Sequence, residues 1–413
     1  MSQASTEITV REVRALATAL LPEVATLAEA MLEYLLERIP EAGGDEEIEG
    51  LTLGSCSSNI EQVLSMVRHG IPVSATEAPV TALEHARAMA ARGRSVDVML
   101  RFYRLGHAFF IERLHREIRD VISDPDALLA ALEELERFAF GYIDAISSQV
   151  AAEYVAELER RQNRARAVRT DMVRTLLAGT KVDLDAAERV LAHRLSGPQL
   201  AFVCWAPRGD VDLAQVGSAV AGLLGSTRPL LQPDGAQALW GWVAGSAAAE
   251  PSVEDVTAVL SAGGEAVHVA FGEPQPGAAG FRASHLEALR AQRVVDLSGR
   301  PAPSATRFGE VALIDALSRD IEAARSLVAR ELGPLAGTGV REGEERAALL
   351  AVLDARGSLA AAAEALGVHR NTVLQRMRRA EDRRGRSAQQ NALELHAALR
   401  LVAVLGRGVL MQS

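Results

Sequence analysis

The first part of the chain spaces its apolar positions as amphipathic helices do. Apolar residues recur every three or four positions in EVATLAEAMLEYLLERI, residues 23–39, and in SVDVMLRFYRLGHAFFIERLHREI, residues 95–118. This spacing places them on one side of a helix. The pattern predicts that residues 1–160 form an all-helical domain. One apolar stripe of the second helix would hold Leu100, Tyr103, His107, Phe110 and Leu114.

A long helix is predicted to connect this domain to the rest of the chain. Residues 147–177 contain neither glycine nor proline, their apolar positions are sparse, and their charges are mixed in sign. Such a surface suits a helix that pairs with a second copy of itself. We therefore expect a connecting helix over residues 161–178 and a homodimer or a higher homo-oligomer.

The pattern changes near Gly179. Three short apolar runs bounded by glycine and proline, residues 199–207, 237–244 and 266–274, predict strands. Helical patterns lie between or after them, in residues 214–225, 253–262 and 277–295. The alternation predicts an α/β or α+β domain over residues 179–336, and AGTGVREGE, residues 336–344, is expected to be the loop that ends it.

The last part of the chain returns to a helical pattern, and we predict a separate domain over residues 345–406. Ser358 suits the N-cap of the second of its helices. Ala363, Gly367 and Val373 then follow the spacing of a helix-turn-helix, which needs a small residue between its helices, a glycine in the turn and an apolar residue on the second helix. The expected fold class is multidomain and mostly α, with a central α+β domain.

Charge is distributed unevenly along the chain, whose formal net charge is −10. From Glu345 to the end, eleven arginines stand against six acids, a net of +5 that leaves −15 for the rest. Seven of these arginines lie between His369 and Arg386. This asymmetry suggests a small module that binds anions, carried by an acidic body. The alternative is a solvated arginine-rich helix in a protein whose basic residues are all arginine except Lys181.

The helix that begins near His369 is predicted to be the recognition helix. Val373, Met377 and Ala380 recur at i, i+4 and i+7 and would face the core. The other side carries groups that hydrogen-bond base edges or phosphates, and the helix N-terminus adds its dipole. Predicted DNA contacts are His369, Arg370, Asn371, Thr372, Gln375, Arg376, Arg378, Arg379 and Arg383, and at the helix end Arg384 and Arg386 are expected on phosphates.

Residues 346–405 resemble the C-terminal helix-turn-helix of the PucR/CdaR family of bacterial transcriptional regulators. The "VHRNT" start of that family's recognition helix matches residues 368–372, and Arg376, Arg379 and Glu381 continue the match. AFGEPQPGAAGFRASHLEALRAQ, residues 270–292, is similar to the family's middle domain, and ELGPLAG, residues 331–337, to its linker. The resemblance implies a regulator that binds double-stranded promoter or operator DNA and responds to a small-molecule effector.

The resemblance also implies that the middle domain is a degenerate relative of diguanylate cyclases. An active cyclase carries Gly-Gly-Asp/Glu-Glu-Phe on a hairpin between two strands. The corresponding region here is residues 230–243, and it contains only an ordinary turn at Pro233-Asp234-Gly235. Gly263-Gly264-Glu265 is interpreted as the end of a helix. Without paired carboxylates for metal ions, phosphoryl transfer lacks its machinery. We therefore expect no enzyme activity, no catalytic residues and no metal site.

Residues 86–110 are similar to the N-terminal domain of the RsbR/RsbRD stress-signalling co-antagonists, which is globin-like in outline. That likeness raises the question of haem, with His85, His107 and His115 as candidate ligands. A histidine on an apolar stripe is more often a hydrogen-bonded core residue, so no cofactor is predicted. A sensory or dimerising role is expected, with a small ligand between helices as one form of it.

Other chemical signals are sparse. Cys56 and Cys204 are expected to be buried, reduced thiols. The N-terminus lacks a secretory pattern, and no run of about 18 apolar residues suggests a membrane span, so a cytoplasmic protein without a membrane partner is predicted. Asp183 and Asp185 suit a helix start. Trp205, Trp240 and Trp242 are expected to pack against the sheet.

Two other functions remain open at the level of sequence. One is a nucleotide cyclase or phosphodiesterase, which the missing signature disfavours. The other is a stress-signalling scaffold with protein partners, which would leave the C-terminal arginines without a role.

Overall fold

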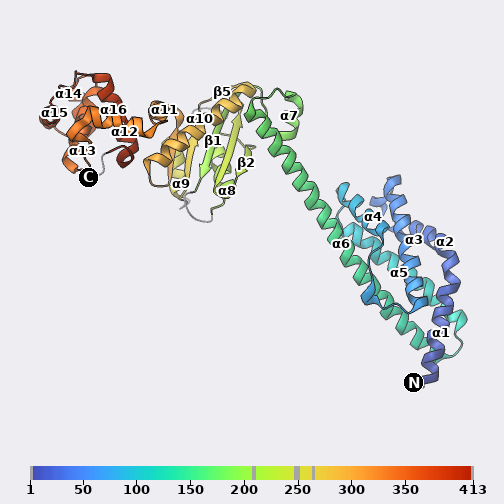
Figure 1. The fold of residues 1–413 in the computed structure, drawn as a ribbon. Coiled ribbons are helices and arrows are strands. Elements are labelled where there is room, and N and C mark those ends of the chain that lie inside the picture. Colours follow the sequence, from blue (N-terminus) through green and yellow to red (C-terminus); the bar gives the residue numbers. More distant parts are fainter. Residues whose placement is uncertain (1–2, 207–210, 246–251, 263–265, 411–413) are drawn as a thin grey trace. The chain divides into compact units, whose positions relative to one another are not determined.

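The computed structural model describes residues 3–206, 211–245, 252–262 and 266–410 (Figure 1). The chain divides into two compact units, Met1–Ala167 and Val168–Ser413.

The first unit is helical, as predicted. Its apolar stripes meet in one core that includes Leu35, Ile60, Met99 and Ile146. The predicted stripe, on α5 (Val96–Val121), faces this core. Tyr103, Phe110 and Leu114 are buried, and Leu100 and His107 are half-buried. The elements are α1 (Gln3–Leu20), η1 (Leu21–Glu23), α2 (Val24–Arg38), η2 (Pro40–Ala42), α3 (Glu46–His69), η3 (Val73–Ala75), α4 (Val80–Ala91), α5 (Val96–Val121) and the first part of α6 (Pro125–Ala178).

One stretch of this unit, Val10–Arg38, is long and apolar enough to cross a membrane by length and composition, with a mean hydropathy of 1.4. In the structure it spans most of α1, then η1 and α2. Its apolar residues Leu20, Met31 and Leu35 are buried in the helical core. About 39% of the window is buried in the unit, so packing accounts for part of its apolar character.

The predicted connecting segment is the second half of α6, a single helix of 54 residues. The helix starts where the Asp124 carboxylate accepts a hydrogen bond from the Ala127 amide at 2.9 Å, with Pro125 at the first helical position. Residues 159–168 are exposed on every side of the helix. No neighbouring element in the described residues covers these turns.

A mixed sheet forms the centre of the second unit. Its strand order is β2-β3-β1-β4-β6, with β5 paired to β1, and all pairs are antiparallel except β4 with β6. The three predicted strands are confirmed as β1 (Pro198–Trp205), β3 (Ala238–Ala244) and β4 (His268–Phe271). Three short strands were not predicted, because they carry too few apolar residues: β2 (Leu230–Asp234), β5 (Gln275–Pro276) and β6 (Ser304–Arg307).

Helices cover both faces of the sheet, and alternate residues of β1 show the division. Leu200, Phe202 and Cys204 pack on the side of α8 (Leu213–Leu223) and α9 (Val253–Ala262). Val203 and Trp205 pack on the side of α10 (Gly277–Ser298), which Figure 1 shows across the strands. Gly263-Gly264-Glu265, the predicted helix end after α9, lies outside the described residues.

The segment that carries the family resemblance, residues 270–292, holds α10 on the sheet. The hydroxyl of Ser284, which is fully buried, accepts a hydrogen bond from the Ala201 amide at 2.8 Å. A Cβ at Gly272 would lie only 1.9 Å from the carbonyl oxygen of Ser284, so only glycine fits there. These residues are therefore structural.

Several smaller predictions hold, most of them in this unit. The Asp183 carboxylate caps α7 (Leu184–Leu191) by accepting from the Ala186 amide at 3.1 Å. The ring of Trp242 stacks on Phe281 at 4.4 Å, and Trp205 donates to the Asp296 carboxylate at 3.0 Å. Both cysteines are free and buried.

The remaining helices join the sheet to the end of the chain. One hydrophobic cluster runs from Val203 and Ala270 in the sheet, through Val328, to Leu395 and Leu399 near the C-terminus. The sheet and the C-terminal helices therefore share a core. The elements are α11 (Phe308–Leu317), α12 (Ile321–Leu332), η5 (Gly333–Ala336), α13 (Val340–Asp354), α14 (Leu359–Leu366), α15 (Arg370–Arg384), α16 (Ala392–Leu405) and η6 (Gly406–Gly408).

The prediction of a loop over residues 336–344 was wrong in its second half. The helix α13 already begins at Val340, and VREGE forms its first turn. An acid in the first turn favours the helix dipole, and Glu342 is also paired with Arg383 at 2.6 Å. These interactions favour the helix in spite of Gly343.

Candidate DNA-binding interface

The helices α14 and α15 and the turn between them form the predicted helix-turn-helix. The α14 N-cap is Ser358, whose hydroxyl accepts from the Ala361 amide at 3.3 Å. Gly367 ends this helix in the left-handed conformation, with φ of 64°, which a residue with a side chain rarely adopts. Its amide hydrogen-bonds to the carbonyl groups of Ala363 and Glu364.

His369 begins the second helix. Its Nδ1 accepts a hydrogen bond from the Asn371 amide at 3.2 Å, so its ring is the N-cap of α15. The imidazole is itself exposed. His369 therefore fixes the helix start and still lies at the surface where DNA contacts were predicted.

The inner side of α15 is the one predicted. Val373 and Ala380 are fully buried, and Met377 packs beside them. Ala363 of α14 is buried in the same small cluster, together with Val352 of α13. Packing thus fixes which side of α15 remains outside.

The outer side of α15 is polar and largely without partners. Thr372 is half-buried, whereas five other polar residues on this side are exposed. Within the described part of the chain, no hydrogen bond or ion pair engages the side chains of these six residues. Three guanidinium groups, one amide from asparagine and one from glutamine are therefore available for an external ligand. The exposed members are Arg370, Asn371, Gln375, Arg378 and Arg379.

Two of the predicted contacts are already paired with α13. Arg376 lies 2.7 Å from the Glu344 carboxylate, and Arg383 lies 2.6 Å from Glu342 and 3.4 Å from Glu345. The pKa of Glu342 lies below its ordinary value, because the backbone amide of Glu342 and then the Arg383 guanidinium stabilise the carboxylate. Sequence analysis could not find these acids, because their pairing depends on how α13 and α15 pack.

The prediction that Arg384 and Arg386 contact phosphates is corrected by the structure. Arg384 is buried and donates to the backbone carbonyl of Glu331 at 2.9 Å. Arg386 donates to the Glu331 carboxylate at 3.3 Å and to the Arg330 carbonyl at 2.7 Å. Burial lowers the pKa of Arg384. Both side chains anchor the end of α15 to α12.

The hairpin of the sheet in the second unit carries no pair of carboxylates. The hairpin of β2 and β3 turns at Asp234, and this is the one acid between residues 226 and 245. Across the described ranges, no group of three or more histidine, cysteine, aspartate or glutamate side chains could hold a metal ion.

The three histidines considered as haem ligands do not gather at one site. His85 is buried in the helical core, and His107 is half-buried. His115 lies 3.3 Å from the Glu136 carboxylate, away from the cavity that the other two line.

Three family models match the chain. Residues 25–169 match the RsbT co-antagonist protein rsbRD N-terminal domain, residues 178–294 match the GGDEF-like domain, and residues 346–401 match the PucR C-terminal helix-turn-helix domain.

Among solved structures, the chain is similar to a regulator of polyketide synthase expression from Bifidobacterium adolescentis. The sequence identity is 19%, the match covers 58% of this chain and 94% of that chain, and the TM-score is 0.29. The comparison with curated proteins gave no match. The three family models, in the order in which they occur, give this chain the domain architecture of a PucR/CdaR-type transcriptional regulator.

Proposed function

We propose that this protein is a cytoplasmic, homodimeric transcription regulator without enzyme activity, which recognises DNA through the outer side of α15 and responds to a small-molecule effector. The observation that carries the proposal is the set of exposed, unpartnered side chains on that helix. Arginine suits guanine and phosphate, and asparagine and glutamine suit adenine. A match to the PucR helix-turn-helix model over residues 346–401 supports the same function.

A homodimer follows from how helix-turn-helix proteins bind. Two recognition helices related by two-fold symmetry can contact two half-sites one helical turn apart. The exposed turns of α6, residues 159–168, are our candidate for part of the dimer interface.

The test begins with selection of preferred duplexes from a random library by the full-length protein. Binding of the selected duplex and of a scrambled duplex is then measured across a salt series. For Arg378→Ala we expect a loss of about 5- to 150-fold on the selected duplex, because a bidentate base contact contributes about 1–3 kcal/mol. The scrambled duplex should lose much less.

The matched control is Arg407→Ala, which removes one exposed arginine of the same unit outside α15. It should leave the difference between the two duplexes unchanged. The triple variant with alanine at 370, 378 and 379 should also flatten the salt dependence, by about 0.9 for each phosphate that is no longer neutralised. Unchanged affinity of this triple variant for the selected duplex would refute the assignment of α15.

A further inference from the structure

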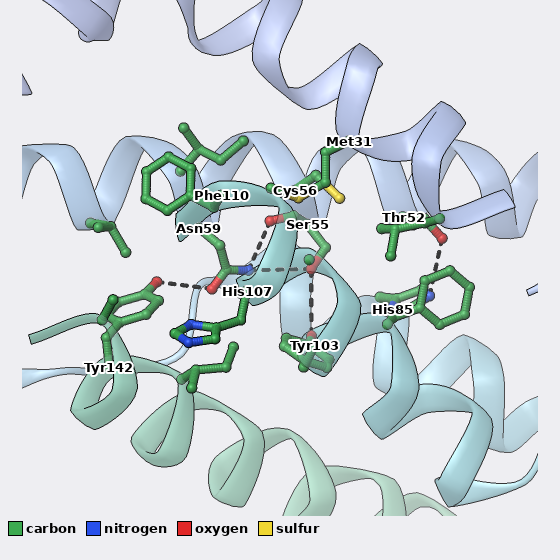
Figure 2. A pocket seen from close by; sticks show the side chains of 17 residues that line it. Met31, Thr52, Ser55, Cys56, Asn59, His85, Tyr103, His107, Phe110 and Tyr142 are labelled. Atoms are coloured by element: carbon green, nitrogen blue, oxygen red, sulfur yellow. Dashed lines mark hydrogen bonds between the residues drawn. The ribbon is translucent and has the colours of Figure 1, made fainter. Parts of the chain in front are cut away.

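The helical unit contains a partly open cavity of about 70 Å³ between α2, α3, α4, α5 and α6 (Figure 2). Most of its lining is apolar, from side chains such as Met31, Phe102 and Phe110. Close-packed interiors hold few voids larger than a water molecule, so a cavity of this size is notable within a core. Its polar groups decide what it can hold.

One hydroxyl hydrogen on the wall has no acceptor. The Asn59 amide donates to Ser55 Oγ at 3.3 Å, and Tyr142 donates to Asn59 Oδ1 at 2.8 Å. The hydroxyl groups of Ser55 and Tyr103 lie 3.4 Å apart and share one hydrogen bond, although each carries a hydrogen. Within the described residues, one of these two hydrogens therefore remains free to be donated (Figure 2).

One histidine that lines the cavity, His85, also has a free acceptor. The Thr52 hydroxyl donates to the Ile48 carbonyl at 2.7 Å, so it can only accept from His85 Nε2, which lies 3.2 Å away. Nε2 of His85 thus carries the ring proton. Burial lowers the pKa of His85 to about 4, so the ring is neutral at pH 7. Nδ1 is then a buried acceptor without a partner in the described part of the chain.

The size and charge of the cavity limit its ligand. No aspartate, glutamate, lysine or arginine is among the described residues that line it, so a charged ligand would lose its hydration without compensation. A cavity of about 150 Å³ accommodates benzene, so one of half that volume holds about three or four heavy atoms.

We propose that this cavity binds a small uncharged effector of about three or four heavy atoms that carries a hydroxyl group. A hydroxyl both donates and accepts, so it matches in kind the free acceptor of His85 and the free hydrogen of the Ser55 and Tyr103 pair. This inference rests on the proposed effector response and assigns it a site and a ligand class.

One of the helices that line the cavity, α6, continues beyond the helical unit. Ala139, Tyr142 and Ile143 line it from α6. The same uninterrupted helix continues to residue 178, and its Val173 and Leu176 are buried in the core of the second unit. A ligand that changes the packing of the first half of α6 therefore acts on a helix that the second unit also holds.

The test uses the full-length protein with ¹³C-labelled methionine methyl groups and 2-propanol as the probe. Met31 lines the cavity, whereas Met66, Met89 and Met99 belong to the same core outside the lining and are internal references. We expect a saturable shift of the Met31 methyl signal. For four heavy atoms the dissociation constant can be no tighter than about 40 µM, so the titration extends to tens of millimolar. Acetone, of equal size but without a hydroxyl hydrogen, should bind at least threefold more weakly.

Two variants and a matched control decide the result. Ala139→Leu fills the cavity from α6 and should abolish saturation, whereas Ala145→Leu, the same change on the same helix outside the lining, should not. His85→Phe should remove the preference for 2-propanol over acetone. A linear shift of Met31, or saturation that persists in Ala139→Leu, overturns the proposal. DNA affinity is measured in the same samples: if selected DNA still binds, the proposed function survives the loss of this site, and if it does not bind, the proposed function fails separately.

Discussion

The arginines within α15 and directly after it have two different roles. Arg370, Arg378 and Arg379 point to solvent without protein partners in the described residues, whereas Arg384 and Arg386 hold the helix against Glu331. The two groups are indistinguishable in the sequence. A guanidinium becomes structural or available for DNA according to which side of the helix it occupies and what packs there.

A prediction at this scale concerns His285, which is buried beside Trp240, with ring centroids 4.6 Å apart. Burial lowers the pKa of His285 to about 4, whereas an unfolded histidine takes up a proton below about 6.5. The unfolded state therefore binds more protons between these values. The stability contribution is complete above about pH 6.5 and is lost as the pH falls toward 4, by roughly 3 kcal/mol in all.

The measurement is the urea midpoint followed by tryptophan fluorescence at pH 7, 6 and 5, since all three tryptophans lie in the second unit. The midpoint should fall with pH, and His285→Phe should flatten the slope. His193 and His268, whose pKa values are also lowered by burial, account for the slope that remains. An identical slope in the variant would contradict the prediction.

The residues of the helix-turn-helix turn could be predicted from the sequence, whereas the acids that pair with the arginines could not. The spacing of Ala363, Gly367 and Val373 is local, because each is separated from the next by a few helical positions, and the structure confirms its geometry. The acids Glu331 and Glu344, which neutralise Arg386 and Arg376, come from other helices. Their contacts depend on tertiary packing, which no local pattern encodes.

At the scale of elements, α6 is the unusual feature. Its middle turns are exposed on all sides, and isolated helices in water are only marginally stable. Ala165 and Val168, three residues apart, are exposed on one side of these turns. Pairing with a second copy along this side would cover the apolar positions and support the exposed turns.

Cross-linking tests this pairing. In Val168→Cys the introduced thiol is exposed, while Cys56 and Cys204 are buried and should not react. Mild oxidation should therefore join two chains in high yield, because the seam of a parallel pair brings equivalent residues together. Asn163→Cys, on the opposite side of α6, is the control and should cross-link poorly. Equal yields from both variants, or a monomeric mass by light scattering, would exclude this interface.

Elements with strong periodicity were predicted, and those without it were not. The strand β1 is a continuous apolar run, and α5 has a clear stripe, so both follow from the sequence. The two residues of β5 and the polar β6 become strands only because β1 and β4 offer free edges to them. The start of α13 was missed for a similar reason, since its supporting contact comes from Arg383.

For the whole molecule, the order of a helical domain, an α/β domain and a helix-turn-helix could be predicted. The apolar spacing changes from helical to strand-like near Gly179 and returns to helical in the last part of the chain, where arginines cluster. The hairpin of the middle domain supports a prediction about chemistry. Because Asp234 is its one acid, the paired carboxylates that hold metal ions in a cyclase are missing there.

Purified protein incubated with GTP and magnesium should therefore form no cyclic dinucleotide above a blank without protein. A known active cyclase, assayed in parallel, verifies the conditions. Product formation well above the blank would show that the middle domain is an enzyme, and it would restore the cyclase alternative.

The cluster that joins Val203 and Ala270 to Leu395 and Leu399 limits how this chain can be divided. A fragment of residues 345–406 would carry an uncovered apolar surface, because Leu395 and Leu399 would lose the side chains of α10 and α12. Fusions that transplant the helix-turn-helix onto another protein should aggregate unless they also carry the sheet. In engineering and in recombination alike, the smallest transferable part that contains the recognition helix begins near residue 168.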